Sequence, residues 1–170
     1  MIRRMLRDQR GLGLLEMVVA VGISGLLASG LGSIGFDLLR HSEVNKAHVT
    51  AASNIEEAAR LVTQDSQSAQ GTDLVAGAAA VNTVTLSWID PTNGDSHVVV
   101  YSLSGDNLVR SKSVNSVVQT VTTAARHISA VSFSQPAGQD RLVKLNVASS
   151  GGSARVNETK EYYVALRALD

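Results

Sequence analysis

The apolar positions of this 170-residue chain form three successive patterns: a continuous run, a helical stripe and a series of alternating segments. The continuous run extends from Met17 to Phe36, and Glu16 is the one charged residue between Leu12 and Phe36. About 20 apolar residues in a helix, at a rise of 1.5 Å each, cross a bilayer core of about 30 Å. The run therefore predicts a single membrane helix.

The residues before this run are basic. Four arginines lie there: Arg3, Arg4, Arg7 and Arg10. Basic residues next to a membrane helix favour the cytoplasmic side. We therefore expect a single pass through the membrane, with the N-terminus in the cytoplasm and the rest of the chain outside.

A helical stripe follows the apolar run. No Gly or Pro occurs between Phe36 and Gly71, so nothing in this stretch signals the end of a helix. One apolar residue recurs at every third or fourth position: Val44, Ala47, Ala51, Ile55, Ala58 and Val62. This spacing is typical of an amphipathic helix that covers a core. The sequence predicts one helix from about Leu14 to Ala69, in which residues 12–36 span the membrane and residues 37–70 continue as the amphipathic part.

The same helix carries one favourable charge spacing. Glu56 and Arg60 stand four residues apart, in the order that stabilises a helix by a few tenths of a kcal/mol. We expect them to form an ion pair.

Residues 71–170 predict an antiparallel sheet domain, because short segments rich in β-branched residues alternate with turn residues. The expected strands are Val81–Asp90, His97–Leu103, Leu108–Val114, Ile128–Ser134, Leu142–Ala148 and Lys160–Leu169. We interpret Val117–Ala125 as a short helix or loop and Ser149–Ser153 as a flexible loop. Strands joined by short turns form a meander. The fold class is therefore α+β, with a long N-terminal helix packed on one C-terminal sheet.

Composition excludes several classes of function. The chain contains no cysteine, which excludes a disulfide framework, thiol catalysis and a cysteine-based zinc site. Formal net charge is zero, and residues 12–170 alone carry 11 basic and 14 acidic residues, a net charge of −3. The lysines and arginines are scattered, so we expect no contact with nucleic acid.

No arrangement of residues predicts catalysis or metal binding. The four histidines, His41, His48, His97 and His127, form no HExxH motif. The acidic turn around Gly94 fails the register of a calcium loop, so a hairpin turn is preferred. No G-x-S-x-G string and no phosphate-binding glycine pattern occur. We expect no enzyme, no catalytic residue, no metal and no cofactor.

Glu16 needs a partner if it enters the membrane. A carboxylate inside hydrocarbon costs roughly 2.5–3.5 kcal/mol, and such residues are usually paired. Beyond the arginine-rich N-terminus, no basic residue lies within one or two helical turns of Glu16. Its partner would then come from another chain or from a new N-terminus made by a nearby cut. The alternative is a glutamate that reaches the membrane surface.

The string from Arg10 to Glu16, RGLGLLE, resembles the class III signal of type IV pilins and type II secretion pseudopilins. This resemblance implies that a prepilin peptidase removes residues 1–11 by cutting between Gly11 and Leu12. It also implies methylation of the new amine on Leu12 and a role in subunit assembly for Glu16, the fifth mature residue. Two positions depart from the family pattern: Leu12 stands where Phe or Met is commoner, and Gly13 where a hydroxyl residue is common.

Small residues recur on the membrane helix. One row contains Ala20, Ser24, Ala28 and Gly32, and a neighbouring row contains Gly25, Ser29 and Ser33. Such rows let helices pack closely in a membrane. The helix contains no proline, whereas many major pilins have one at about this depth, so the resemblance favours a minor pilin or pseudopilin.

Three further strings are similar to W-type minor pilins and J-type minor pseudopilins: RLVTQD at 60–65, YSLSGDNLVR at 101–110 and YVALR at 163–167. The resemblance implies a structural subunit of a type IV pilus, a competence pilus or the pseudopilus of protein secretion. Its expected partners are the prepilin peptidase, other pilin or pseudopilin subunits, the inner membrane and the platform on which the filament assembles.

Two alternatives remain open. The first is a membrane-anchored binding or sensor domain that keeps residues 1–11 and never polymerises. The second is a secreted protein with an ordinary signal peptide, cut near Ala28-Ser29-Gly30.

Overall fold

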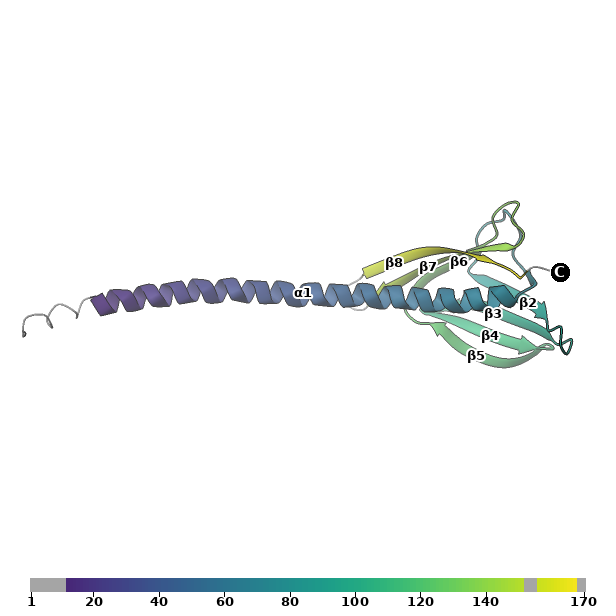
Figure 1. The fold of residues 1–170 in the computed structure, drawn as a ribbon, viewed down its shortest axis with the longest axis horizontal. Coiled ribbons are helices and arrows are strands. Elements are labelled where there is room, and N and C mark those ends of the chain that lie inside the picture. Colours follow the sequence, from purple (N-terminus) through teal and green to yellow (C-terminus); the bar gives the residue numbers. More distant parts are fainter. Residues whose placement is uncertain (1–11, 152–155, 168–170) are drawn as a thin grey trace, which may run out of the picture. The chain divides into compact units, whose positions relative to one another are not determined.

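The computed structural model describes residues 12–151 and 156–167, and it leaves out the side chains of residues 12, 32–35 and 37. The chain divides into two compact units, Met1–Glu43 and Val44–Asp170. Helix α1, Leu12–Ser68, contributes to both units, and every described strand belongs to the second (Figure 1). The expected leader, residues 1–11, lies outside the described residues.

Helix α1 is the single long helix that the sequence predicts, with ends within two residues of the expected Leu14 and Ala69. At its C-terminal end the Ala69 N–H donates to the carbonyls of Asp65 and Ser66, at 2.9 and 3.1 Å. The chain then passes directly into the first strand at Gly71.

Eight strands follow the helix. They are β1 Gly71–Thr72, β2 Thr83–Ile89, β3 Ser96–Ser104, β4 Asn107–Val114, β5 Val117–Ala125, β6 Ile128–Ser134, β7 Leu142–Gly151 and β8 Val156–Ala165. Every neighbouring pair within a sheet is antiparallel. This confirms the α+β fold class.

The strands form two sheets, whereas we expected one meander. One sheet has the order β1-β2-β3-β4-β5 and the other β6-β7-β8. The break comes after β5, where His127 adopts a positive φ of 56° and the chain turns away. The segment before β2 meets β6 at an antiparallel bridge between Val81 and Phe133, whose N–H groups donate to each other's carbonyls at 2.9 and 2.7 Å.

Two segments that we interpreted as helix or loop are strands. Val117–Ala125 is β5, because its β-branched Val and Thr residues pair with β4, while Ala124 and Ala125 are buried. The expected loop Ser149–Ser153 was also wrong as far as Gly151, since residues 149–151 pair with β8. The Ser149 hydroxyl is buried and donates to the His127 carbonyl at 2.8 Å. Residues 152–155 lie outside the described residues.

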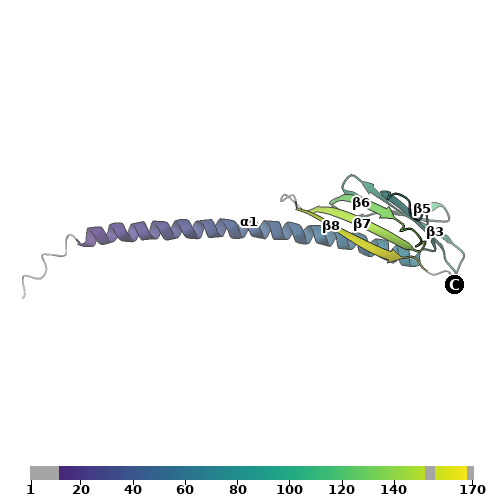
Figure 2. The ribbon, with the colours of Figure 1, turned by 90° about the horizontal axis from the view of Figure 1, so that it is seen from above.

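The predicted stripe of α1 is buried against the strands, and its Ile55, Ala58 and Val62 belong to the core. Five of its six positions are buried, and Val44 is half-buried. The side chains of the same core come from both sheets, and the largest are Tyr101, Phe133, Leu86, Leu108, Ile128 and Leu145. Figures 1 and 2 show this part of the helix lying along the strands of the same unit. Burial of these side chains supplies most of the favourable free energy of folding in this unit.

The expected ion pair between Glu56 and Arg60 is not formed. Instead Glu56 accepts a hydrogen bond from Lys160 of β8 at 3.0 Å. This bond raises the pKa of Lys160 above its ordinary value. A cross-element pair replaces the local pair because β8 lies beside this part of the helix.

Candidate functional site

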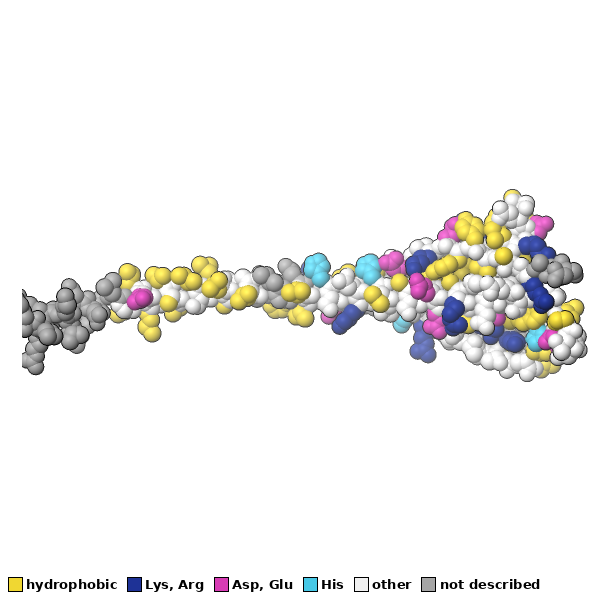
Figure 3. Space-filling view, in the orientation of Figure 1, with side chains coloured by type: hydrophobic (Ala, Val, Ile, Leu, Met, Phe, Trp, Pro, Cys, Tyr) yellow, Lys and Arg dark blue, Asp and Glu magenta, His cyan; other side chains and the backbone are white. Residues whose placement is uncertain are grey.

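The N-terminal part of α1 is apolar and exposed. Residues Gly13–Leu31 form a stretch of 19 residues with a mean hydropathy of 2.0, long and apolar enough to cross a membrane by length and composition. None of it is buried within the chain. Leu14, Met17 and Leu26 each expose more than 70% of their surface. Hydrophobic side chains dominate this stretch in Figure 3. The stretch therefore has no internal core to pack against and needs an external apolar partner.

Glu16 lies in the first turns of this exposed helix. Among the described residues it makes no hydrogen bond or ion pair. Its expected partner, from another chain or from a new N-terminus, stays a prediction. Ala20, Ser24 and Ala28 of the expected packing row are all exposed on the helix, and Gly32 is helical but its packing is not described. Gly11 lies outside the described residues, and Leu12 is the first residue of α1.

The hydroxyl of Ser29, in the row of Gly25, Ser29 and Ser33, is hydrogen-bonded within its own helix. Its hydroxyl donates to the Leu26 carbonyl at 2.8 Å. A hydroxyl bonded in this way can enter a lipid or helix-packed environment without an unsatisfied donor. The side chain of Ser29 is therefore small and compatible with close packing of helices.

A cluster of polar side chains connects the end of α1 to the five-stranded sheet. The carboxylate of Asp65 accepts from Nε and Nη2 of Arg110 at 2.6 and 2.7 Å, and from the Tyr101 hydroxyl at 2.5 Å. Tyr101 comes from β3 and Arg110 from the neighbouring position of β4, since the two are register partners. We call these three residues the Asp65 clamp. It holds a helix and two strands through one carboxylate.

The clamp is largely withdrawn from water. Tyr101 is fully buried, and the side chains of Asp65 and Arg110 are 10% and 19% exposed. Burial and the hydrogen bond to Asp65 raise the pKa of Tyr101 well above its ordinary value, so the phenol stays protonated as a donor. The hydrogen bond to Asp65 likewise raises the pKa of Arg110. A two-point guanidinium–carboxylate contact fixes orientation as well as charge. The cluster is thus a structural contact between the helix and the sheet, in which both oxygens of the Asp65 carboxylate accept hydrogen bonds.

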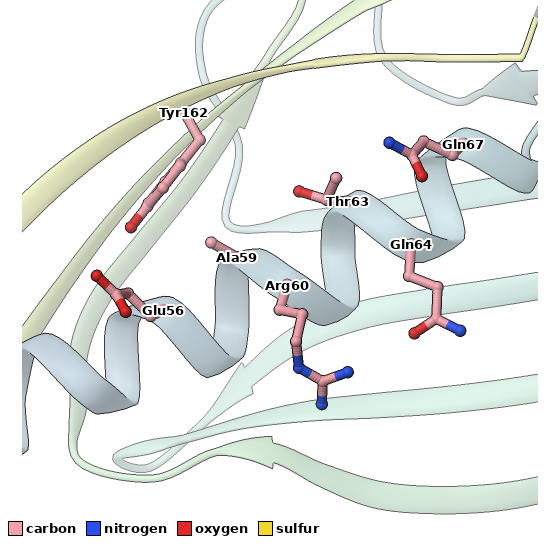
Figure 4. Close-up of a pocket in the computed structure, with 7 residues that line it drawn as sticks. All are labelled: Glu56, Ala59, Arg60, Thr63, Gln64, Gln67 and Tyr162. Carbon is pink, nitrogen blue, oxygen red and sulfur yellow. The ribbon is translucent and has the colours of Figure 1, made fainter.

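A groove of about 460 Å³ lies between α1 and β8. Its lining residues are Glu56, Ala59, Arg60, Thr63, Gln64, Gln67 and Tyr162 (Figure 4). Tyr162 lies over the helix near Glu56 and Ala59, whereas the Arg60 and Gln64 side chains extend from the helix away from it. Among the described residues, no hydrogen bond joins a hydroxyl and a carboxylate of this lining.

The other polar candidates serve the fold. Asp95 accepts hydrogen bonds from the amides of Asn93 and Asn115, both at 2.7 Å, which makes the acidic turn a hairpin closed by its own side chains. His48 contacts Glu158 at 2.6 Å, and the His97 ring stacks on Trp88 with centroids 5.1 Å apart. Among the described residues, no three His, Cys, Asp or Glu side chains come together as metal ligands could.

Sequence reasoning missed the clamp as a cluster. Its three residues lie within strings that we noted for a family resemblance, at 60–65 and 101–110. Nothing in those strings indicates that the residues meet, because the contacts join positions 36 and 45 residues apart. The one available signal was an arginine and a tyrosine on adjacent strands of a predicted hairpin.

Comparison with known proteins gives one match. A family model described as the prokaryotic N-terminal methylation motif matches residues 6–32. The match contains the RGLGLLE string and most of the exposed apolar part of α1. Neither the curated proteins nor the solved structures contain a match to this chain.

The motif supports the type IV pilin and pseudopilin family for this chain, without distinguishing the W and J types. It indicates a structural protein processed as a prepilin, a type that is usually not an enzyme. It also implies processing by a prepilin peptidase and assembly with other pilin subunits. With the apolar helix, the motif suggests a single-pass, membrane-anchored protein.

Proposed function

We propose that this prepilin-type chain is a minor subunit of a filament: a type IV pilus, a competence pilus or the pseudopilus of type II secretion. The observation that carries the proposal is the methylation motif at residues 6–32, continuous with a helix that is apolar and exposed. A helix of this kind can leave lipid for a bundle of identical helices without losing its apolar surroundings. The absence of proline from this helix supports a minor rather than a major subunit.

In this proposal the chain is cut between Gly11 and Leu12 on the cytoplasmic side, and the new amine of Leu12 is methylated. The strands and the second half of α1 then stand in the periplasm or outside the cell. The filament assembly platform would lift the helix out of the membrane. The match across the cut site supports this processing, and the arginines before it support the orientation.

Glu16 has a specific role in this assembly. Its carboxylate would meet the cationic N-terminal amine of a neighbouring subunit inside the helix bundle. Two opposite charges in a dry bundle attract strongly but also lose hydration, so the pair sets register more than it adds stability. The exposure of Glu16 and its lack of a partner among the described residues support this role.

The rows of small residues would form the contact between neighbouring helices. Ala20, Ser24 and Ala28 are exposed, and Gly13, Gly22 and Gly25 have no neighbouring heavy atom within 4 Å of an added Cβ position. Space of this kind is what a neighbouring helix needs for close approach. The packing of Gly32 belongs to the same proposal.

Intact mass and an N-terminal peptide map of the protein from its native membrane test the proposal. We expect a chain that begins at Leu12 and is heavier by one methyl group. A chain that begins at Met1 or Ile2 would contradict the proposal and favour a membrane-anchored domain that does not polymerise. A chain that begins near Leu31 would favour a secreted protein.

A further inference from the structure

The turn between β2 and β3 contains the single Asn-Gly pair of the sequence, Asn93-Gly94. Both residues are exposed to solvent, and Gly94 has a positive φ of 77°. In an Asn-Gly pair the backbone nitrogen of the glycine can attack the side-chain amide of the asparagine, because glycine carries no Cβ that hinders the approach. The pair is therefore a candidate site of spontaneous deamidation, a reaction whose only co-reactant is water.

The closed turn holds both reacting groups in hydrogen bonds. The Gly94 N–H, which must lose its proton before the nitrogen can attack, donates to the Asp90 carbonyl at 2.8 Å. Asn93 Nδ2 donates to Asp95 Oδ2 at 2.7 Å, and Asn93 Oδ1 accepts from the Asp95 N–H at 3.0 Å. Asp95 is itself held by Asn115, whose Nδ2 donates to the other carboxylate oxygen at 2.7 Å. These contacts oppose the attack for as long as the turn stays closed.

We propose that Asn93 is a deamidation site gated by this turn: the reaction proceeds when the turn opens, and its product keeps the turn from closing again. The Gly94 nitrogen gives up its proton and forms a bond with Cγ of Asn93. The Cγ–Nδ2 bond breaks, and Nδ2 takes up a proton and leaves as ammonia. Water then opens the succinimide ring and leaves an aspartate or isoaspartate at position 93. One water is consumed, one ammonia is released, and nothing is oxidised or reduced.

The product cannot restore the contacts of the closed turn. A carboxylate at position 93 would face the Asp95 carboxylate with no hydrogen atom between them, at the place where the amide now donates at 2.7 Å. Asp90 of the same turn is a third carboxylate, and hydrogen bonds from Thr92 lower its pKa, so it too is charged. Like charges this close repel. The modification would therefore leave a permanently open turn at this end of the five-stranded sheet.

Peptide mapping by mass spectrometry measures the reaction in the full-length protein, solubilised in detergent at mildly alkaline pH. Asp95→Ala removes the acceptor of the Asn93 amide and leaves the Asn-Gly pair intact. We expect this variant to deamidate at Asn93 on the order of tenfold faster, the effect of losing one hydrogen bond to a charged group. Asp106→Ala is the matched control. Asp106 is exposed in the next turn, between β3 and β4, so this variant should react at the rate of the unaltered protein.

The unaltered protein unfolded in urea gives the rate of the fully open turn. We expect the folded chain to deamidate at Asn93 more slowly than the unfolded chain, by a factor on the order of ten or more. This comparison tests the gate even if Asp95→Ala fails to fold, which the fluorescence of Trp88, the single tryptophan, reveals. Equal rates in the folded and unfolded chains would overturn the proposal. So would a folded Asp95→Ala variant that reacts no faster than the unaltered protein.

Asn93→Asp carries the carboxylate of the product and tests its effect. Trp88 stacks on His97 next to this turn, with ring centroids 5.1 Å apart, so we expect an open turn to change the Trp88 emission. Asn82→Asp, exposed just before β2, is the control and should leave the emission unchanged. Unchanged emission in Asn93→Asp would show that the product fits the closed turn, against the proposal. None of these measurements requires cleavage before Leu12 or filament assembly, so their failure leaves the proposed function standing.

Discussion

Asp65 carries more of the polar organisation of the second unit than any other single described side chain. Its two oxygens accept three hydrogen bonds from two strands, and its backbone carbonyl caps the end of α1 by accepting from Ala69. A buried ion pair of this kind offsets its own desolvation, so its presence adds little net stability. Removing one partner is different, because the remaining charge stays buried and unpaired.

We predict that Asp65→Asn lowers the free energy of unfolding by about 3 kcal/mol, the lower end of the range for breaking a buried pair. The lower end applies because Arg110 retains 19% side-chain exposure and can gain water. Urea unfolding of the detergent-solubilised full-length protein, followed by Trp88 fluorescence, measures this change. Trp88 belongs to β2, so the signal reports the sheet rather than the membrane helix.

Asp106→Asn is the matched control for this prediction. Asp106 is 67% exposed and lies 3.6 Å from His127, so its loss should change stability by less than about 0.5 kcal/mol. Equal losses in the two variants would show that the Asp65 clamp contributes nothing beyond an exposed charge.

The contacts of the Asp65 clamp could not be predicted from the sequence. Asp65 follows Val62 by three positions and so continues the spacing of the apolar stripe, where an acidic residue needs a buried partner. Its role depends on which strand faces the last turns of α1. That arrangement is a tertiary property, and no local pattern encodes it.

Among the elements, β7 and α1 approach each other unusually closely. A Cβ atom built on Gly151, at the end of β7, would lie 2.0 Å from the carbonyl oxygen of Ala47 and 3.0 Å from its Cα. Ala47 is itself a small residue in the buried stripe. The contact therefore requires glycine on the strand, since backbone atoms of the helix cannot yield as a flexible side chain does.

We predict that Gly151→Ala separates this end of β7 from α1 and costs about 1–3 kcal/mol, the usual range for overpacking. Thermal unfolding followed by Trp88 fluorescence measures the loss. Gly71→Ala is the control, because its added Cβ meets only the Ser87 hydroxyl at 3.5 Å, an ordinary contact. If Gly151→Ala proves as stable as Gly71→Ala, the close approach at Ala47 is not required by the fold.

The elements differ in how far the sequence predicts them. The stripe from Val44 to Val62 predicts its own burial, because a 3.6-residue period allows only one face to reach the core. Strand β5 was missed because its last two residues and the following Arg126, Ala-Ala-Arg, are good helix formers while its Val and Thr residues favour a strand. Pairing with β4 decided between the two, which is tertiary context overriding local preference.

At the scale of the whole molecule, one continuous helix contributes to two different environments. Its first part, Gly13–Leu31, has no buried residue, whereas its second part carries the buried stripe of the core. The described apolar residues of the first unit thus have no buried contacts within the chain, whereas the second unit supplies its own core. This division is consistent with the proposed passage from membrane to filament.

We predict that Glu16→Gln leaves membrane insertion intact and lowers recovery of the protein in sheared filaments on the order of tenfold, the effect of about 1.4 kcal/mol at one contact. Glutamine keeps the size of the side chain and removes the charge that would meet the amine of Leu12. Immunoblots of membrane and sheared-filament fractions measure both quantities.

Glu57→Gln is the matched control, since Glu57 is exposed on the second part of α1. It should reach filaments at the level of the unaltered protein. Equal recovery of Glu16→Gln and Glu57→Gln would end the proposal that the Glu16 carboxylate pairs with a neighbouring amine.

The assembly of the strands into two sheets was the main feature of the whole fold that the sequence did not predict. Short turns predict which strands are consecutive, but not where a sheet ends. Here the end depends on the positive φ of His127 and on the Val81–Phe133 bridge, which joins positions 52 residues apart. The N-terminal signal, by contrast, is local, and a short string together with an apolar run was enough to predict it.

The side-chain contacts between α1 and the two sheets also have a mechanical consequence. A pull on the second part of the helix reaches one sheet through Asp65 and the other through the pairs of His48 and Glu56 with β8. Two sheets thus share one load in parallel, and each contact joins polar side chains of different elements, so it resists sliding as well as separation. Should one of them rupture, the tension passes to the other sheet instead of stripping the helix from its core.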